Sequence, residues 1–285
     1  MTIALQIQSD YAYCERIIRK HSKSFYFAFS KLPKQKAQAV YAVYAFCRIA
    51  DDSVDEHTSP SEQLLALNTL EKELELFEQG KEISHPLWRA LRDVFQWFDM
   101  DIQPFYDQLA GQRMDINFSI PKTLDDLEHY SKLVAGSVGL MLQPIIASKV
   151  REDLTEVSLN LGIAMQITNV LRDIGEDLRD KDRIYLPLEE MAKANYTMTD
   201  FLNGHITPEF IQLWEKLAAR AEALYDTFQM HIDQFDADSQ QPVAASAHIY
   251  REILNAVRKN DYDCFTKRSF VQKHKMINIR ECLNA

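Results

Sequence analysis

The sequence has 285 residues, of which 46% are hydrophobic and 26% charged, and its formal net charge is −10. That composition is sufficient for a large buried core. The acidic balance argues against nucleic acid as a partner, because nucleic-acid phosphates require a basic surface, and against electrostatic adsorption to anionic lipid.

Helical periodicity recurs along the chain, without the alternation that strands produce. The 7 glycines and 9 prolines are few and scattered, which leaves long segments free of helix breakers. No linker divides the chain, so we expect one all-α domain over residues 1–285. The expected helices are 9–30, 34–56, 61–78, 86–99, 102–117, one that begins at Thr123 and runs through Tyr130, 151–179, 188–194, 207–232 and 243–259.

The helix expected over 34–56 carries a polar stripe. Tyr44, Arg48, Asp51 and Asp55 are spaced by 4, 3 and 4 residues. At 3.6 residues per turn they fall within roughly 60° of one another. One side of this helix therefore presents an aromatic ring, a guanidinium and two carboxylates.

A second stripe lies on the helix expected over 151–179. Gln166, Asn169, Asp173 and Asp177 are spaced by 3, 4 and 4 residues, so four oxygen-bearing side chains follow one another at about one turn. Apolar residues flank both stripes, and helices that are apolar nearly all round are usually buried. We therefore expect the carboxylates to face an interior cavity.

Carboxylates gathered in a cavity need a counter-charge. Two of them about 5 Å apart repel by roughly 3 kcal/mol at an effective dielectric constant near 20. The available ligands are all oxygen atoms, which favours Mg²⁺, or Mn²⁺, over zinc or copper. Arg48 and Arg172 lie beside the stripes and suit phosphate oxygens, which often complete a magnesium shell. A single Asp-Asp-x-x-Asp run is more often a solvated helix face, but two such stripes favour a metal site.

The chain resembles the squalene/phytoene synthase family, and within it the bacterial dehydrosqualene (4,4′-diapophytoene) synthases. The resemblance covers nearly the whole chain, in the order and at the separations typical of the family. The matching segments are residues 21–25 (His-Ser-Lys-Ser-Phe), 47–55, 130–139, 161–177 and 183–187. One departure is Asp182, where many relatives have glycine, and it leaves the conformation of that turn open.

The resemblance implies an isoprenoid-synthase-type helical bundle around a central cavity. It also implies condensation of two farnesyl diphosphates through a cyclopropyl diphosphate intermediate, as a step of carotenoid biosynthesis that requires two or three Mg²⁺ ions. The implied metal ligands are Asp51, Asp55, Asn169, Asp173 and Asp177. The implied substrate contacts are His21, Ser22, Lys23, Ser24, Tyr44, Arg48, Gln166, Arg172 and Tyr250. The implied catalytic residues are Asp51, Asp55, Asp173, Asp177, Tyr130, Arg48 and Arg172. Arg268 is a weaker candidate for a diphosphate contact.

Other functions remain open from the sequence. They include a phytoene synthase acting on geranylgeranyl diphosphate, a squalene synthase, a cyclising terpene synthase and, outside enzymes, a helical scaffold with acidic patches. No feature indicates an obligate protein partner or a Rossmann-type cofactor site. We expect a cytoplasmic protein that makes transient contact with a membrane, because its substrates and product would be strongly apolar.

Overall fold

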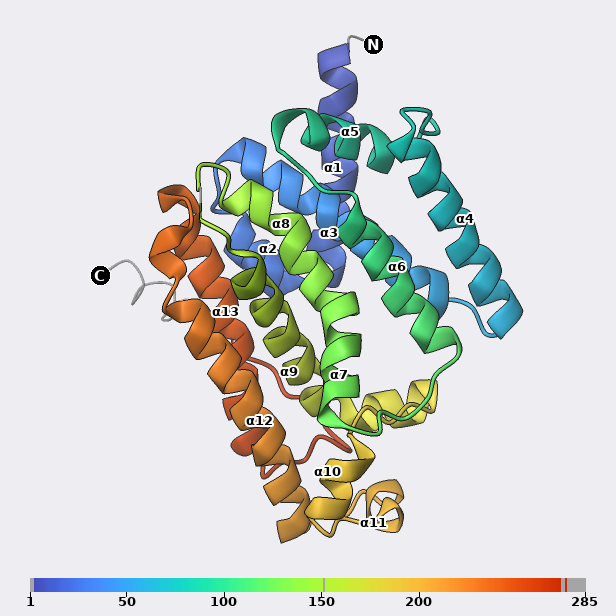
Figure 1. Ribbon diagram of the computed structural model, residues 1–285, viewed down its shortest axis with the longest axis vertical. Coiled ribbons are helices and arrows are strands. Elements are labelled where there is room, and N and C mark those ends of the chain that lie inside the picture. Colours follow the sequence, from blue (N-terminus) through green and yellow to red (C-terminus); the bar gives the residue numbers. More distant parts are fainter. Residues whose placement is uncertain (1–2, 151, 273–274, 276–285) are drawn as a thin grey trace.

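The computed structural model describes residues 3–150, 152–272 and 275, and this part of the chain contains helices and no strand (Figure 1). The all-α prediction is confirmed. The elements are α1 (Ile3–His21), α2 (Lys23–Phe29), α3 (Lys34–Asp55), α4 (Pro60–Glu78), α5 (Pro86–Trp97), α6 (Gln103–Ile116), α7 (Leu124–Ser131), the π-helical turn η1 (Lys132–Gly136), α8 (Ser137–Ile146), α9 (Thr155–Lys181), α10 (Leu188–Lys193), α11 (Met198–Leu202), α12 (Pro208–Gln229), the 3₁₀ turn η2 (Ile232–Gln234) and α13 (Ala237–Arg258).

Two helices form the centre of the bundle. Helix α9 packs against α12, α13, α8 and η1, and α3 packs against α1, α4, α5, α6 and α8 (Figure 1). Their apolar residues are buried, among them Phe46 on α3 and Leu171 on α9, both 0% exposed. These are the two helices that carry the acidic stripes, so the polar side chains project from the most enclosed elements of the fold.

Several predicted helix boundaries were wrong. The helix expected over 9–30 begins at Ile3 and is divided at Ser22, whose hydroxyl accepts a hydrogen bond from Phe25 N–H (3.4 Å) and caps α2. Helix α13 begins at Ala237 instead of 243 and contains Pro242, and the short helix α11 was not expected. A helix does begin after Thr123, which forms a capping box with Asp126.

The turn after α9 explains the departure at Asp182. This residue has φ 52° and ψ 39°, a left-handed conformation that glycine adopts most easily and aspartate tolerates. Its backbone N–H still donates to the Asp177 carbonyl, as a helix C-cap does. The aspartate therefore keeps the turn that glycine would form.

Close backbone contacts fix α8 and η1 on α9. A Cβ atom on Gly139 would lie 2.2 Å from the Ser158 carbonyl oxygen, and one on Gly162 would lie 2.3 Å from the Ala135 carbonyl oxygen. Because the chain direction pairs residue 135 with 162 and 139 with 158, the two segments are antiparallel. The end of α8 at Ile146 therefore lies at the end of α9 that is remote from Asp177.

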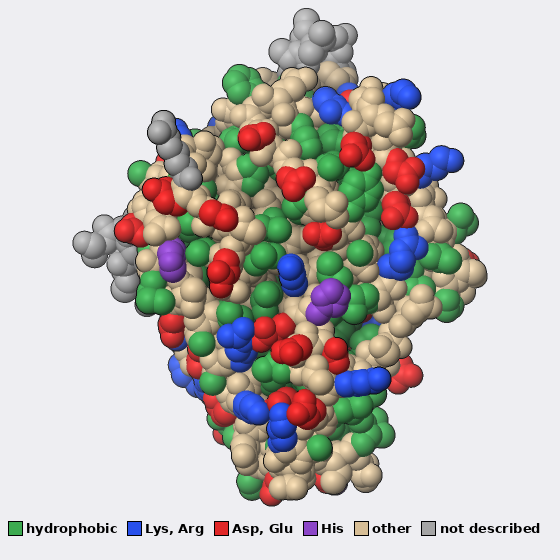
Figure 2. Space-filling view, in the orientation of Figure 1, with side chains coloured by type: hydrophobic (Ala, Val, Ile, Leu, Met, Phe, Trp, Pro, Cys, Tyr) green, Lys and Arg blue, Asp and Glu red, His purple; other side chains and the backbone are tan. Residues whose placement is uncertain are grey.

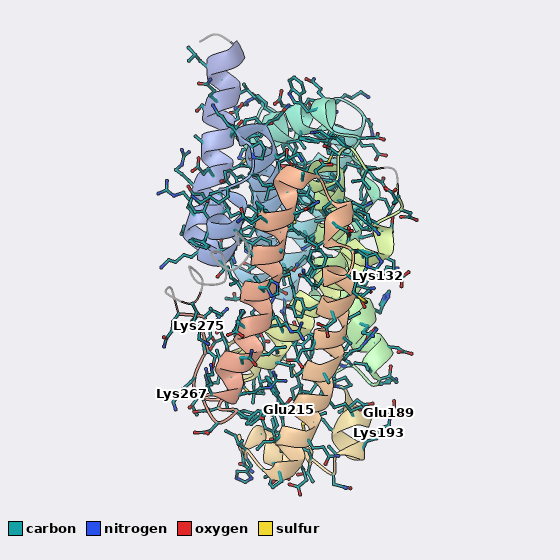
Figure 3. All side chains as sticks on the ribbon, turned by 90° about the vertical axis from the view of Figure 1, so that its left-hand side faces the viewer. Lys132, Glu189, Lys193, Glu215, Lys267 and Lys275 are labelled. Atoms are coloured by element: carbon teal, nitrogen blue, oxygen red, sulfur yellow. The ribbon has the colours of Figure 1, made fainter. Side chains whose placement is uncertain are left out.

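Helices α12 and α13 run beside each other on another face of the molecule (Figure 3). Glu215, labelled between them in Figure 3, forms an ion pair with Arg258 at 2.7 Å and accepts a hydrogen bond from the Tyr262 hydroxyl at 2.7 Å. On the face shown in Figure 2, acidic, basic and apolar side chains are interspersed. Among the described residues, none of the helices is both long and apolar enough to cross a membrane.

Candidate active site

A cavity of about 400 Å³ lies between α2, α3, α6, η1, α8, α9 and α13. It brings together both predicted stripes. The predicted site residues in its lining are His21, Ser22, Tyr44, Arg48, Asp51, Asp55, Tyr130, Gln166, Asn169, Arg172, Asp173, Asp177 and Tyr250. Lys23 and Ser24 are absent from the lining, and Lys23 is exposed at the start of α2. Their proposed role in substrate binding thus has no support from the cavity.

The α3 wall of the cavity presents Asp51 and Asp55. Burial raises the pKa of Asp51 to about 7, and its Oδ1 accepts a hydrogen bond from Gln112 Nε2 at 2.5 Å. The Asp55 carboxylate forms an ion pair with Lys181 at 2.8 Å. Arg48, one turn before Asp52, forms an ion pair with that third aspartate. The Asp51 carboxylate thus lies where its ionised form needs a nearby cation.

The α9 wall presents the second stripe. Burial raises the pKa of Asp177 to about 7 as well. Asp173 Oδ1 accepts from Arg172 Nε at 2.7 Å and lies 3.3 Å from Arg268 Nε. Asn169 Oδ1 is buried and has no hydrogen-bond partner. An amide oxygen in that state is costly to bury unless a ligand engages it.

The chemistry of these two walls fits a hard divalent cation. Every candidate donor is an oxygen atom, two of the carboxylates lie where burial disfavours their charge, and one amide oxygen lacks a partner. Within residues 3–150, 152–272 and 275, no three His, Cys, Asp or Glu side chains form a compact group able to hold a metal. The donors instead line one cavity from two helices, α3 and α9, an arrangement suited to a cation that also binds water and phosphate oxygens.

Helix α6 contributes a third polar stripe that we did not identify from the sequence. Gln108, Gln112 and Asp115 are all buried, and all three line the cavity. Their spacing of 4 and 3 residues is the spacing that marked the other two stripes. The signal was therefore present in the sequence, but glutamine at helical spacing is common on exposed surfaces and was not distinctive.

Asp115 connects the cavity to the segment that follows α9. It accepts hydrogen bonds from the hydroxyls of Tyr130 (3.0 Å) and Tyr185 (2.9 Å), and Arg183 Nη1 lies 3.3 Å from its carboxylate. The two tyrosine rings are stacked, with centroids 5.1 Å apart. Arg183 Nη1 also lies 3.9 Å from Asp55 Oδ1. Lys181 and Tyr185 thus also line the cavity, and Arg183 contacts two of its carboxylates, those of Asp55 and Asp115.

Arg268 reaches the cavity although it lies near the end of the described chain. A Cβ on Gly175 would lie 1.9 Å from the Phe265 carbonyl oxygen, so the segment before Arg268 crosses directly over α9. Arg268 Nη1 forms an ion pair with Glu176 at 2.7 Å, and the side chain lines the cavity beside Asp173. Arg268, a weak candidate from the sequence, therefore lies in the cavity wall next to a predicted metal ligand.

The remote end of the cavity is apolar. From Asp177 to Ser158, both of which line it, α9 rises by about 28 Å at 1.5 Å per residue. Beyond Ser158 the antiparallel α8 supplies Leu142 and Ile146, and the segment before α13 supplies Phe235. The cavity thus has a charged end and a long apolar end. The aromatic side chains of Phe25, Phe29 and Tyr44 also line the wall.

The chain is similar to known proteins over most of its length. Residues 18–275 match the family model for squalene/phytoene synthase. The chain is 38% identical to 15-cis-phytoene synthase from Synechococcus elongatus, over 93% of this chain and 89% of that protein. It is 37% identical to chloroplastic phytoene synthase 2 from Oryza sativa subsp. japonica, over 96% of this chain and 69% of that protein.

Solved structures show the same architecture. A dehydrosqualene synthase crystallised in complex with a ligand is 44% identical, with a TM-score of 0.93 over 98% of this chain and 97% of that one. The squalene synthase HpnC from Alicyclobacillus acidocaldarius is 25% identical, with a TM-score of 0.82 over 91% of this chain and 97% of that one.

Proposed function

Because this chain belongs to the squalene/phytoene synthase family, we propose that it condenses two farnesyl diphosphates head to head to give dehydrosqualene (4,4′-diapophytoene), a carotenoid precursor. The family consists of prenyltransferases, and the chain is an enzyme of that class. The choice of farnesyl diphosphate rests on the 44% identity to a dehydrosqualene synthase over almost the entire length of both chains.

The charged end of the cavity is suited to the diphosphate groups. When bound by Asp51, Asp55, Asn169, Asp173 and Asp177, Mg²⁺ would neutralise the diphosphate as it departs. Arg48 and Arg172 lie beside these carboxylates in the lining and can donate paired hydrogen bonds to phosphate oxygens. Tyr250 and Gln166 add neutral hydrogen-bonding groups at the same end.

The apolar end serves the second requirement of the reaction, exclusion of water from an allylic cation. Phe25 packs edge to face with Tyr250 (centroids 5.4 Å apart) and lies 6.3 Å from the Tyr44 ring. All three rings line the cavity, where their faces can stabilise positive charge by roughly 0.5–2 kcal/mol each. Tyr130 contributes a phenol oxygen at the charged end.

A phytoene synthase is the second candidate, because the curated relatives that match most of this chain carry that name. The two reactions differ in the length of the prenyl chain, C15 or C20, and not in the chemistry at the diphosphates. In either case the hydrocarbon product has no polar group, so we expect it to leave through transient contact with a membrane surface.

The test is a product assay. Purified protein with Mg²⁺ and farnesyl diphosphate should yield dehydrosqualene without any reductant, and geranylgeranyl diphosphate should be a poorer substrate.

EDTA should abolish turnover, and Asp51→Ala or Asp173→Ala should lower it by about 10²- to 10³-fold while the helical circular dichroism is retained. Phytoene as the main product would favour the second candidate, and wild-type activity in both variants would refute the site.

A further inference from the structure

Gln112 is held in a fixed position on the cavity wall by its own helix. One turn before it, Gln108 Oε1 accepts a hydrogen bond from the Ser137 hydroxyl at 2.9 Å, which ties α6 to α8. Less than one turn after it, Asp115 is held by Tyr130 and Tyr185. Gln112 lies between these two residues on the same side of α6. The hydrogen bonds of Gln108 and Asp115 therefore fix the rotation of α6 about its own axis at Gln112.

A close helix contact adds to this restraint. A Cβ on Gly111 would lie 2.6 Å from Val134 Cγ1 and 3.1 Å from Leu133 Cβ, so α6 meets η1 directly next to Gln112. Gln112 itself is 6% exposed, and a side chain that is enclosed in this way has few alternative rotamers. Its amide is directed toward Asp51 on α3.

In that direction Gln112 Nε2 donates to Asp51 Oδ1 at 2.5 Å. A carboxylate offers about four lone-pair sites on its two oxygens, so one amide donor leaves the others available. The hydrogen bond fixes the rotation of the carboxylate about its Cβ–Cγ bond and thereby the direction of its free lone pairs. Outer hydrogen bonds of this kind orient metal-ligating carboxylates and strengthen metal binding.

We propose that Gln112 is a positioning residue for Asp51, which it orients to bind the divalent cation. This inference rests on the proposed function, since it takes Asp51 to be a metal ligand. Loss of the Gln112 amide should weaken binding of the cation while leaving the pyrophosphate-binding arginines in place. Saturating Mg²⁺ should then restore most of the turnover.

The experiment measures Mn²⁺ binding directly. Wild-type protein and Gln112→Met are titrated with Mn²⁺ in the presence of inorganic pyrophosphate, and free Mn²⁺ is measured by electron paramagnetic resonance. The expected rise in the Kd for Mn²⁺ is about 10- to 100-fold. Gln112→Ala is measured in parallel, because it removes the amide without placing an apolar group against Asp51, and it should show a rise as well.

Two further variants separate the possible outcomes. Gln103→Met makes the same chemical change in the exposed first turn of α6, outside the cavity lining, and its Kd for Mn²⁺ should stay within about twofold of wild type. Asp51→Ala should abolish the tight Mn²⁺ site. Unchanged Mn²⁺ binding in both Gln112 variants, with loss in Asp51→Ala, would overturn this inference alone. Unchanged binding in Asp51→Ala would overturn the proposed metal site itself.

Discussion

The phenol of Tyr130 donates its hydrogen bond to a buried carboxylate, that of Asp115, at 3.0 Å. Burial raises the pKa of Asp115, while Arg183 and the two phenols oppose that rise. Burial also raises the pKa of Tyr130, to which Asp115 contributes, so the proton stays on the phenol. Tyr130 is therefore present in the site as a neutral phenol whose proton is directed to Asp115.

Replacement of Asp115 by Asn should lower both the free energy of unfolding and the turnover number. The variant leaves Arg183 with no buried carboxylate partner at that position, and removal of one member of a buried ion pair costs about 3–5 kcal/mol. Urea denaturation measures that loss, and steady-state kinetics at full substrate saturation measures turnover. Tyr185→Phe is the matched control, since it removes one hydrogen bond to Asp115 and keeps the ion pair, so its loss should be smaller. Equal effects in the two variants would contradict the role given to the carboxylate.

Site residues could be predicted from the sequence where several polar residues recur at helical spacing on a single helix. The stripes on α3 and α9 follow from spacing, and the cavity contains all their members. Asp115 and Lys181 were not identified, and Arg268 was only a weak candidate, because their place in the site depends on how α6, the end of α9 and the segment after α13 pack. Spacing along one helix carries no information about which other helix faces it.

One buried ion cluster connects three helices whose ends are distant in the sequence. Lys36 on α3 forms ion pairs with Asp236 (2.6 Å) and Asp238 (2.5 Å). Asp236 also accepts from the backbone N–H groups of Ser148 (2.9 Å) and Lys149 (3.0 Å), just after α8. The cluster therefore joins the beginnings of α3 and α13 to the end of α8. No periodic pattern revealed it, because the partners of Lys36 are about 200 residues away in the sequence.

Asp236→Asn should destabilise the protein by about 3–5 kcal/mol near neutral pH, since it leaves Lys36 buried with one partner fewer. Although burial opposes ionisation, hydrogen bonds from Lys36 and Ser148 lower the pKa of Asp236 below its ordinary value. A lowered folded-state pKa gives stability that is present above the unfolded value of about 3.9 and is lost as the pH falls through the folded value. The difference in unfolding free energy between wild type and Asp236→Asn should therefore shrink below about pH 4.

Asp238→Asn serves as the control for this prediction. The Asp238 side chain is 37% exposed, against 2% for Asp236, so its ion pair is better screened by solvent. Its removal should cost about 0–1 kcal/mol. Urea denaturation of the three proteins between pH 3 and 7 provides both comparisons. A loss in Asp238→Asn as large as that in Asp236→Asn would show that burial does not determine the strength of these pairs.

The antiparallel packing of α8 on α9 sets the length of the cavity, which runs through the centre of the bundle. The backbone contacts at Gly139 and Gly162 place Ile146 beyond Ser158, at the end remote from the carboxylates. The Ile146 carbonyl accepts from Asp236 N–H at 3.1 Å, and Phe235 is the residue directly before that contact. Phe235 is 3% exposed and packs edge to face on Phe228. The ion cluster around Asp236 thus also holds the side chains that close the apolar end.

Phe235→Ala should therefore extend the space available to the prenyl chain. Wild-type protein should prefer farnesyl diphosphate, and the variant should shift the ratio of kcat/KM for the C20 and C15 substrates toward C20 by about tenfold or more, equivalent to about 1.4 kcal/mol. Phe25→Ala makes the same substitution near the carboxylates, where the ring contacts Tyr250, so it should lower the rate with both substrates and leave their ratio unchanged. Competition between the two diphosphates, with the hydrocarbon products resolved by chromatography, measures the ratio directly. If the kcat/KM ratio shifted toward C20 in Phe25→Ala but not in Phe235→Ala, side chains close to the diphosphates would determine the preferred chain length. The far end of the cavity would then not determine it.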